Sequence, residues 1–287
     1  MLKLTPVLIV GMARSGTTLV SHILGSLPGV HIEVEPHALW KSGNFKYFND
    51  EQYDITDTIV KNIQQKFSEN IGEKILVEKS PINSLRPHLV HAVFPDAKII
   101  YIEREPVRCI YSNYQRSVKK DSFKLSIILK KYFVYTGSKD LSGAISQRKL
   151  FQQISISDLP AFIRYTAYMF YLRQVSGHLP FGPKLKNFAS HVKEKGLLDY
   201  HVSVYKKSQI CKEKYKELYK ENMQVFSMEK IMEGDDEINN MILFSGIEMP
   251  DGWIHEIRKT FDTERIEASE KSSEVDKEIL KLLSQPS

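Results

Sequence analysis

The stretch VLIVGMARSGTT, residues 7–18, decides the fold of this chain. Val7–Val10 is short and rich in β-branched residues, which predicts a buried strand. Gly11 ends that strand, and residues 16–26 follow as a predicted helix that Pro28 and Gly29 stop. A turn that opens a helix presents free N–H groups and the positive end of the helix dipole to an anion. The stretch therefore predicts a phosphate-binding turn at residues 11–18.

The residues within the turn indicate which kind of phosphate group it binds. Its spacing is that of a nucleotide P-loop, G-x-x-x-x-G, but Thr17 stands where a nucleoside triphosphatase needs its Lys. Arg14 is the cation of this loop, so a single 5′-phosphate and its substituent suit it better than a β/γ-phosphate chain. The candidate ligand-binding residues of the loop are Arg14, Ser15, Gly16, Thr17 and Thr18. The alternative is a strand, turn and helix that bind nothing.

Outward from the loop, apolar strand-like runs alternate with amphipathic helical runs. The further predicted strands are 30–34, 74–77, 98–102 and 225–226, and the predicted helices between them include 55–67 and 85–93. This alternation predicts an α/β fold with a central parallel sheet and helices on both faces. Residues 108–135 and 188–220 are predicted to be mostly helical, which gives helical insertions in the second half. We expect a single domain, residues 1–287, because no repeat or linker divides the chain.

Composition excludes several classes of protein. The chain has 287 residues, a net charge of +5 and two cysteines, Cys109 and Cys211. Two cysteines provide neither a disulfide framework nor zinc spacing, and no run approaches the roughly 18 apolar residues of a membrane span. The mild basic excess suits an anionic ligand without requiring nucleic acid. Without a signal-peptide pattern at the N-terminus, the expected location is cytoplasmic.

The loop sequence GMARSGTTL at residues 11–19 is accompanied by a second motif, IIYIEREP at residues 99–106 followed by Ser112. Together the two motifs resemble the sulfotransferase family that uses 3′-phosphoadenosine 5′-phosphosulfate (PAPS). The first motif resembles the family's 5′-phosphosulfate-binding loop, and the second resembles its 3′-phosphate-binding element. In that element Arg104 offers a planar fork to a terminal phosphate, and Ser112 adds a hydroxyl from about two turns into the next helix. The resemblance implies a P-loop-like three-layer fold, PAPS as donor and 3′-phosphoadenosine 5′-phosphate (PAP) as product.

The resemblance also suggests the catalytic residues. Sulfuryl transfer needs cations on the leaving oxygens and a base for the acceptor proton. Arg14 is the first predicted cation, and Lys79, in a Lys-x-Pro element at a strand end, is the second. Glu35 is the predicted base, because glycan-sulfating and protein-tyrosine members carry a Glu at this offset. Two alternatives are Glu33, expected on the same strand face, and His37.

The sequence therefore predicts a sulfotransferase that acts on an acceptor hydroxyl of a carbohydrate or small molecule. The segment 181–184 resembles an acceptor-side segment of bacterial members. We expect no metal, no nucleic acid and no membrane span. Two alternatives stay open: a P-loop-type kinase or nucleoside triphosphatase, and a non-catalytic nucleotide- or glycan-binding module. The acceptor, the sulfated position and the oligomeric state are not determined by the sequence.

Overall fold

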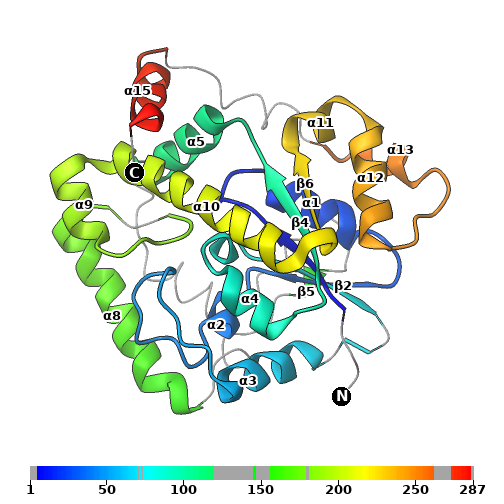
Figure 1. The fold of residues 1–287 in the computed structure, drawn as a ribbon, viewed down its shortest axis with the longest axis horizontal. Coiled ribbons are helices and arrows are strands. Elements are labelled where there is room, and N and C mark those ends of the chain that lie inside the picture. The colour runs from blue at the N-terminus through cyan, green and yellow to red at the C-terminus, as the bar shows by residue number, and fades with distance from the viewer. Residues whose placement is uncertain are drawn as a thin grey trace.

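A parallel β-sheet forms the centre of the molecule in the computed structural model (Figure 1). The structure describes residues 5–69, 71–72, 74–118, 145–146, 156–178, 181–261 and 273–285. The strand order is β5-β2-β3-β1-β4-β6, and all neighbouring strands pair in parallel. The strands are β1 (Val7–Val10), β2 (Val30–Val34), β3 (Ile75–Lys79), β4 (Lys98–Glu103), β5 (Ile145–Ser146) and β6 (Met223–Ser227). The predicted α/β class is confirmed.

Alternate residues of the strands build two separate cores, because successive side chains of a strand point to opposite faces. Val7 and Ile9 pack in the core beneath α1 (Thr17–Gly25), α11 (Met228–Glu233), α12 (Asp235–Ser245) and α13 (Trp253–Arg258). Leu8 and Val10 pack on the other face, beneath α3 (Asp57–Ser68), α4 (Pro87–Val93) and α10 (Leu197–Tyr219). Both faces are therefore covered, as the β-branched runs of the sequence indicated.

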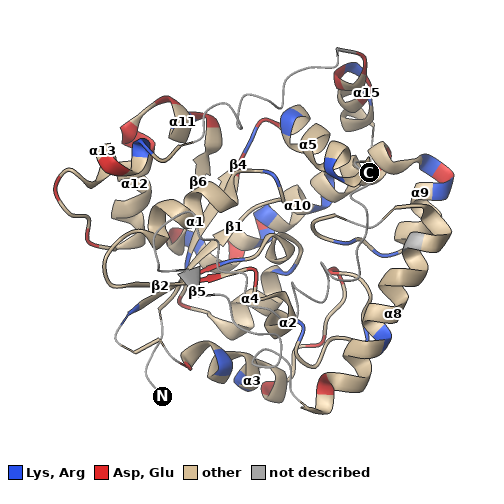
Figure 2. Ribbon diagram, turned by 180° about the vertical axis from the view of Figure 1, so that it is seen from behind, with Lys and Arg blue, Asp and Glu red and all other residues tan. Residues whose placement is uncertain are grey.

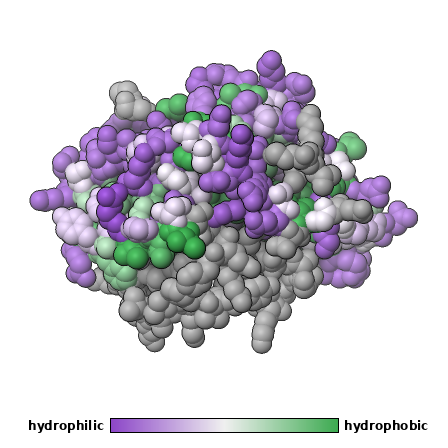
Figure 3. All heavy atoms as spheres, turned by 90° about the horizontal axis from the view of Figure 1, so that it is seen from below, coloured by the Kyte–Doolittle hydropathy of each residue, from purple (hydrophilic) through white to green (hydrophobic). Residues whose placement is uncertain are grey.

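The remaining helices lie around this three-layer centre. Among the described residues, the remaining α-helices are α2 (His37–Trp40), α5 (Pro106–Val118), α8 (Leu159–Ser176), α9 (Phe188–Lys195) and α15 (Ser273–Ser284). In Figure 1, α8 and α9 lie to the left of the sheet and α11 to α13 lie to its right. Acidic and basic residues occur together on α9, whereas α8 is mostly uncharged (Figure 2). Seen from below, the coloured surface is mostly hydrophilic, with an apolar area toward one side (Figure 3).

The helix predicted over 108–135 is α5 as far as Val118, and residues 119–135 lie outside the described residues. The strand predicted over 74–77 extends to Lys79, so Glu78 and Lys79 belong to β3. Parallel pairing with β1 carries the strand on through these charged residues, which the apolar pattern alone could not show. This extension places Lys79 at the edge of the sheet where β1 also ends.

Candidate active site

The loop between β1 and α1 has two residues in the left-handed backbone region. Arg14 has φ 70° and Gly16 has φ 99°, and the Ser15 N–H donates to the Met12 carbonyl at 3.1 Å. A Cβ atom on Gly16 would lie 2.2 Å from Sδ of Met228. Glycine at residue 16 is therefore required both by its backbone and by its close contact with α11.

The first turn of α1 is open to an anion. Gly16 is the N-cap of this helix and has no side chain to bond the N–H groups at its start, so within the loop these groups are left for an anion. Arg14 and Thr18 are exposed, whereas the side chains of Ser15 and Thr17 are buried. An anion at this turn would thus meet two exposed side chains and backbone N–H groups. The hydroxyls of Ser15 and Thr17 face the protein interior.

The structure brings the two phosphate motifs into direct contact, although about a hundred residues separate them. Nε of Arg14 donates to Oγ of Ser112 at 2.9 Å, and Nη1 of Arg104 donates to the Arg14 carbonyl at 3.2 Å. The cause is the sheet order: β1 and β4 are neighbours, with Val10 beside Tyr101. In parallel neighbouring strands the loops that follow the carboxyl ends meet at the same edge.

A second group of predicted residues meets on the α1 side of that edge. Lys79, almost completely buried, directs Nζ to Oε1 of Glu35 at 2.7 Å and to Oγ1 of Thr18 at 3.2 Å. The Glu35 N–H donates to the Lys79 carbonyl at 2.7 Å. Arg14, Thr18, Glu35 and Lys79 therefore surround the start of α1. The sequence had not indicated that Thr18 links the loop to Lys79.

Glu35 is kept ionised by its two neighbours, Lys79 and His37. Burial raises the pKa of Glu35, but the hydrogen bond with His37 and the charge of Lys79 outweigh burial, so its pKa lies well below 4.5. Nε2 of His37 lies 3.4 Å from Oε2 of Glu35, and Nδ1 of His37 is buried from solvent. The Glu35 side chain remains about one-third exposed. Glu35 is thus ionised, reachable and bordered by Lys79 and His37.

Glu33 lies on a different face from the Glu35 carboxylate, contrary to the alternation expected from the sequence. β2 ends at Val34, and Glu35 has φ 53°, so the alternating pattern stops between the two residues. Glu33 pairs in register with Glu78, while the Glu35 carboxylate contacts Lys79, the next residue of β3. Successive residues of a strand face opposite sides. Glu33 is buried and interacts with His31 at 3.1 Å.

The segment 181–184 lies against the phosphate loop. A Cβ on Gly182, which has φ 74°, would lie 2.9 Å from Cβ of Ala13. Lys184 holds this segment in place through Asp50, which is completely buried: the Lys184 N–H donates to Oδ2 of Asp50 at 2.8 Å. Asp50 also contacts Arg86 and Lys41. Burial raises the pKa of Asp50, but the charges of Lys184 and Arg86 outweigh it, so Asp50 stays ionised.

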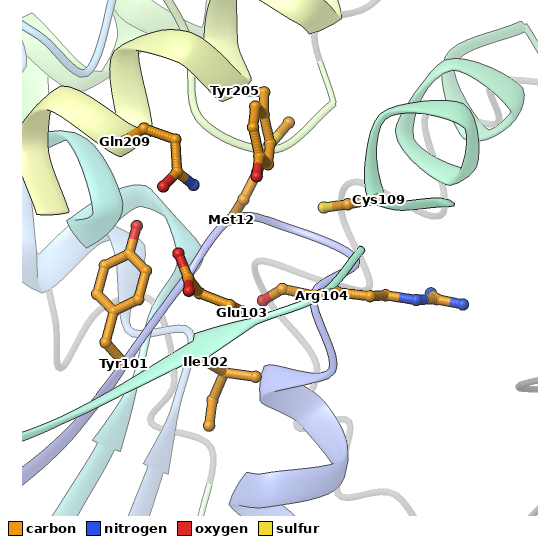
Figure 4. A pocket seen from close by; sticks show the side chains of 9 residues that line it. Met12, Tyr101, Ile102, Glu103, Arg104, Cys109, Tyr205 and Gln209 are labelled. Atoms are coloured by element: carbon orange, nitrogen blue, oxygen red, sulfur yellow. The ribbon is translucent and has the colours of Figure 1, made fainter. Parts of the chain in front are cut away.

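A small pocket lies behind the loop at the end of β4 (Figure 4). Its lining residues come from the loop, β4, α5 and α10, and they are Met12, Ser15, Tyr101, Ile102, Glu103, Arg104, Cys109, Tyr205 and Gln209. In Figure 4 the Glu103 carboxylate points toward Gln209, while the Arg104 guanidinium points away from both. The Arg104 guanidinium therefore does not point into this pocket. No sequence motif had pointed to Tyr205 or Gln209.

Two kinds of site are not found in the part of the chain that the structure describes. Within the described ranges, no group of three or more His, Cys, Asp or Glu residues is arranged to hold a metal ion. Among the same residues, no helix is both long and apolar enough to cross a bilayer.

Comparison with known proteins finds a family model that matches part of this chain. A model described as "Sulfotransferase family" matches residues 43–149, a range that includes Lys79, Arg104 and Ser112. This match confirms the resemblance to sulfotransferases. An uncharacterized protein of Aquifex aeolicus (strain VF5) is 30% identical over 129 residues, which is 39% of this chain. The match spans only 17% of that relative's length.

Solved sulfotransferase structures are also similar. The sulfotransferase domain from the curacin biosynthetic pathway has a TM-score of 0.46 at 17% identity, over 88% of this chain and 77% of its own. The Alicyclobacillus acidocaldarius sulfotransferase has 0.41 at 17%, over 94% and 98%. A mouse sulfotransferase in complex with PAP has 0.41 at 13%, over 94% and 68%. At these TM-scores, the fold assignment rests on the strand order and connections of this chain itself.

Proposed function

We propose that this chain, which carries the sequence pattern of the sulfotransferase family, transfers the sulfuryl group of PAPS to an acceptor hydroxyl. The observation that carries the proposal is the contact between the two phosphate motifs. Arg14 of the loop bonds to Ser112, and Arg104 bonds to the carbonyl of Arg14. A ligand with a phosphate at each end of one nucleoside needs two anion sites at a short, fixed separation. The three residues provide such a pair of sites.

The residues present fit this donor. At the 5′ end, the open first turn of α1 offers N–H groups, and the exposed side chains of Arg14 and Thr18 add a charge and a hydroxyl. At the 3′ end, Arg104 would bind the phosphate through its planar guanidinium and Ser112 through its hydroxyl. When bound, PAPS supplies an activated sulfuryl group joined to its 5′-phosphate.

The side chains around the start of α1 then have distinct roles. Lys79 and Arg14 stabilise negative charge on the sulfuryl oxygens and on the leaving phosphate. Glu35 takes the proton of the acceptor hydroxyl, since it is ionised and about one-third exposed. Glu33 is buried on the other face, and His37 directs Nε2 to Glu35 while its Nδ1 is buried. Glu35 is therefore the best placed of the three candidate bases.

Lys79 links the donor and the base. With its Nζ 2.7 Å from Glu35, it keeps that carboxylate weakly basic. A negatively charged sulfuryl group beside Thr18 would compete with Glu35 for the Lys79 ammonium. As Lys79 turns to the donor, the pKa of Glu35 rises and Glu35 becomes a stronger base. We propose that base strength and donor binding are coupled in this way.

The acceptor side is formed by segment 181–184, which lies against the loop at Ala13. We propose a hydroxyl-bearing carbohydrate or small molecule as acceptor and a cytoplasmic location. A kinase or nucleoside triphosphatase is the competing enzyme class. Thr17 in place of the P-loop Lys, with its side chain buried, disfavours it. The sequence Glu103-Arg104 at the end of β4 likewise lacks the aspartate that binds magnesium in that class.

Calorimetric titration of the purified chain tests the proposal. We expect PAP to bind with a dissociation constant near 1 μM, about −8 kcal/mol, and adenosine 5′-phosphate and ATP to bind much more weakly. Preference for ATP would replace the sulfotransferase proposal with a nucleoside triphosphatase. Binding of PAP without any release of PAP from PAPS would instead identify a non-catalytic module. Binding of none of the three nucleotides would refute the donor assignment.

A further inference from the structure

Helix α5 holds the phosphate loop through two successive residues. Ser112 accepts a hydrogen bond from the Arg14 side chain at 2.9 Å. The next residue, Asn113, is 1% exposed and donates from Nδ2 to the backbone carbonyl of Ala13 at 2.6 Å. The same amide nitrogen donates to the Cys109 carbonyl at 2.9 Å. Ser112 of α5 thus contacts the side chain of Arg14, and Asn113 contacts the loop backbone at Ala13.

The orientation of the Asn113 amide is determined by its surroundings. Two of the three groups that face Nδ2 are carbonyl oxygens, which accept and cannot donate, and the third is Sγ of Cys109 at 3.9 Å. Rotating the amide by 180° would place Oδ1 against these two oxygens. In the observed orientation Oδ1 is buried and has no hydrogen-bond partner among the described residues. The amide orientation that binds the Ala13 carbonyl therefore leaves Oδ1 of Asn113 without a hydrogen-bond partner among the described residues.

The Ala13 carbonyl matters because it controls the backbone angle of Arg14. The carbonyl of one residue and the N–H of the next belong to the same rigid peptide plane. The angle φ of Arg14 is the rotation about its N–Cα bond, between that plane and the rest of Arg14, so an Ala13 carbonyl held in place restricts φ of Arg14. That angle is 70°, which is unfavourable for a residue with a Cβ. The cost of such a backbone and the gain from one buried hydrogen bond are similar in size.

We propose that Asn113 is a positioning residue for the donor site, which acts by holding the Ala13 carbonyl and thereby the left-handed backbone of Arg14. The Arg14 side chain then reaches Ser112, and the loop keeps the shape in which it meets the 5′-phosphate. This inference rests on the proposed function only in assigning the loop to the donor. The hydrogen bond from Asn113 to the loop is present in the chain without ligand.

Hydrogen–deuterium exchange of the nucleotide-free protein tests the hold directly. Asn113→Ala should speed exchange of the amides of residues 14–18 about fivefold or more, from the loss of one buried hydrogen bond. Gln115→Ala is the matched control, because it removes a side-chain amide from the same helix at a partly exposed position. It should leave these amides unchanged. Equal exchange of residues 14–18 in wild type and Asn113→Ala would overturn the proposal.

A double-mutant cycle separates positioning from a general structural role. Glycine adopts a positive φ without cost, so Arg14→Gly removes the need for Asn113 to hold that angle. The stability loss caused by Asn113→Ala should therefore be smaller in the Arg14→Gly protein than in wild type. Urea unfolding measures both losses, and equal losses in the two backgrounds would contradict the proposal. If Asn113→Ala does not fold, Asn113→Ser, which replaces the amide with a shorter side chain that bears a hydroxyl, takes its place in both measurements.

Nucleotide binding adds a third readout. Asn113→Ala should weaken PAP and adenosine 5′-phosphate by the same factor, because the loop binds the phosphate that both share. Ser112→Ala should weaken PAP more, because only PAP has the 3′-phosphate. Loss of PAP binding alone in Asn113→Ala would place its effect at the 3′ site and overturn the inference. If the wild type binds neither nucleotide, the proposed function fails, while exchange and the mutant cycle still decide the role of Asn113.

Discussion

Glu78 should make the stability of the folded protein fall as pH rises through neutrality. This residue is completely buried at the end of β3, next to Lys79, and it accepts hydrogen bonds from Trp40 at 2.9 Å and Asn83 at 3.3 Å. Burial raises its pKa from 4.5 to about 7. At 1.36 kcal/mol per pKa unit, this difference corresponds to about 3 kcal/mol.

The sign follows from proton linkage. The folded state binds the Glu78 proton more tightly than the unfolded state, so the stabilisation is complete below pH 4.5. It is lost as pH rises through about 7. Glu78→Gln removes the titration and keeps an acceptor for Trp40. Asn83 can rotate its amide to accept from the new Gln, because its Oδ1 has no partner among the described residues.

The assay is denaturant unfolding followed by circular dichroism, at several pH values from 5 to 9. The stability of Glu78→Gln relative to wild type should increase by up to about 3 kcal/mol over this range. Glu213→Gln is the control: the hydrogen bond from Lys216 lowers the pKa of Glu213, so this exposed group changes stability only in acid. Parallel stability curves for Glu78→Gln and wild type would refute the reasoning, because they would mean that Glu78 is ionised in the folded protein.

Three further substitutions test the site. Lys79→Met should raise the pKa of Glu35 and slow the release of PAP from PAPS about 100- to 1,000-fold; an unchanged rate would exclude Lys79 from the chemistry. Arg104→Ala should weaken PAP at least about tenfold in calorimetry and adenosine 5′-phosphate much less, through the lost hydrogen bond to the Arg14 carbonyl, whereas equal losses would argue against a 3′-phosphate site. Gly16→Ala should destabilise the protein by about 1–2 kcal/mol from its φ of 99° alone, in addition to its contact with Met228. Adding Met228→Ala should restore only the contact part in thermal unfolding, and complete recovery would show that the backbone angle is not strained.

The strand, turn and helix at residues 7–18 were determined by the sequence, and so was the α/β class. Both depend on local properties: the β-branched run, the glycines at 11 and 16, and apolar residues at strand or helix spacing. The position of Arg104 after the strand at 98–102 was local in the same sense. These patterns need no knowledge of which strands are neighbours.

The meeting of those elements was decided by the tertiary structure alone. Arg14 contacts Ser112 because β1 and β4 are adjacent, and Lys79 contacts Glu35 because β2 and β3 are adjacent. The sequence did not predict the positive φ of Glu35, which takes its carboxylate to the opposite side from Glu33. Asn113 gave no signal either, because a single amide on a helix has a role only when another segment brings a carbonyl to it. Strand order and helix packing bring distant residues together, and no local pattern encodes them.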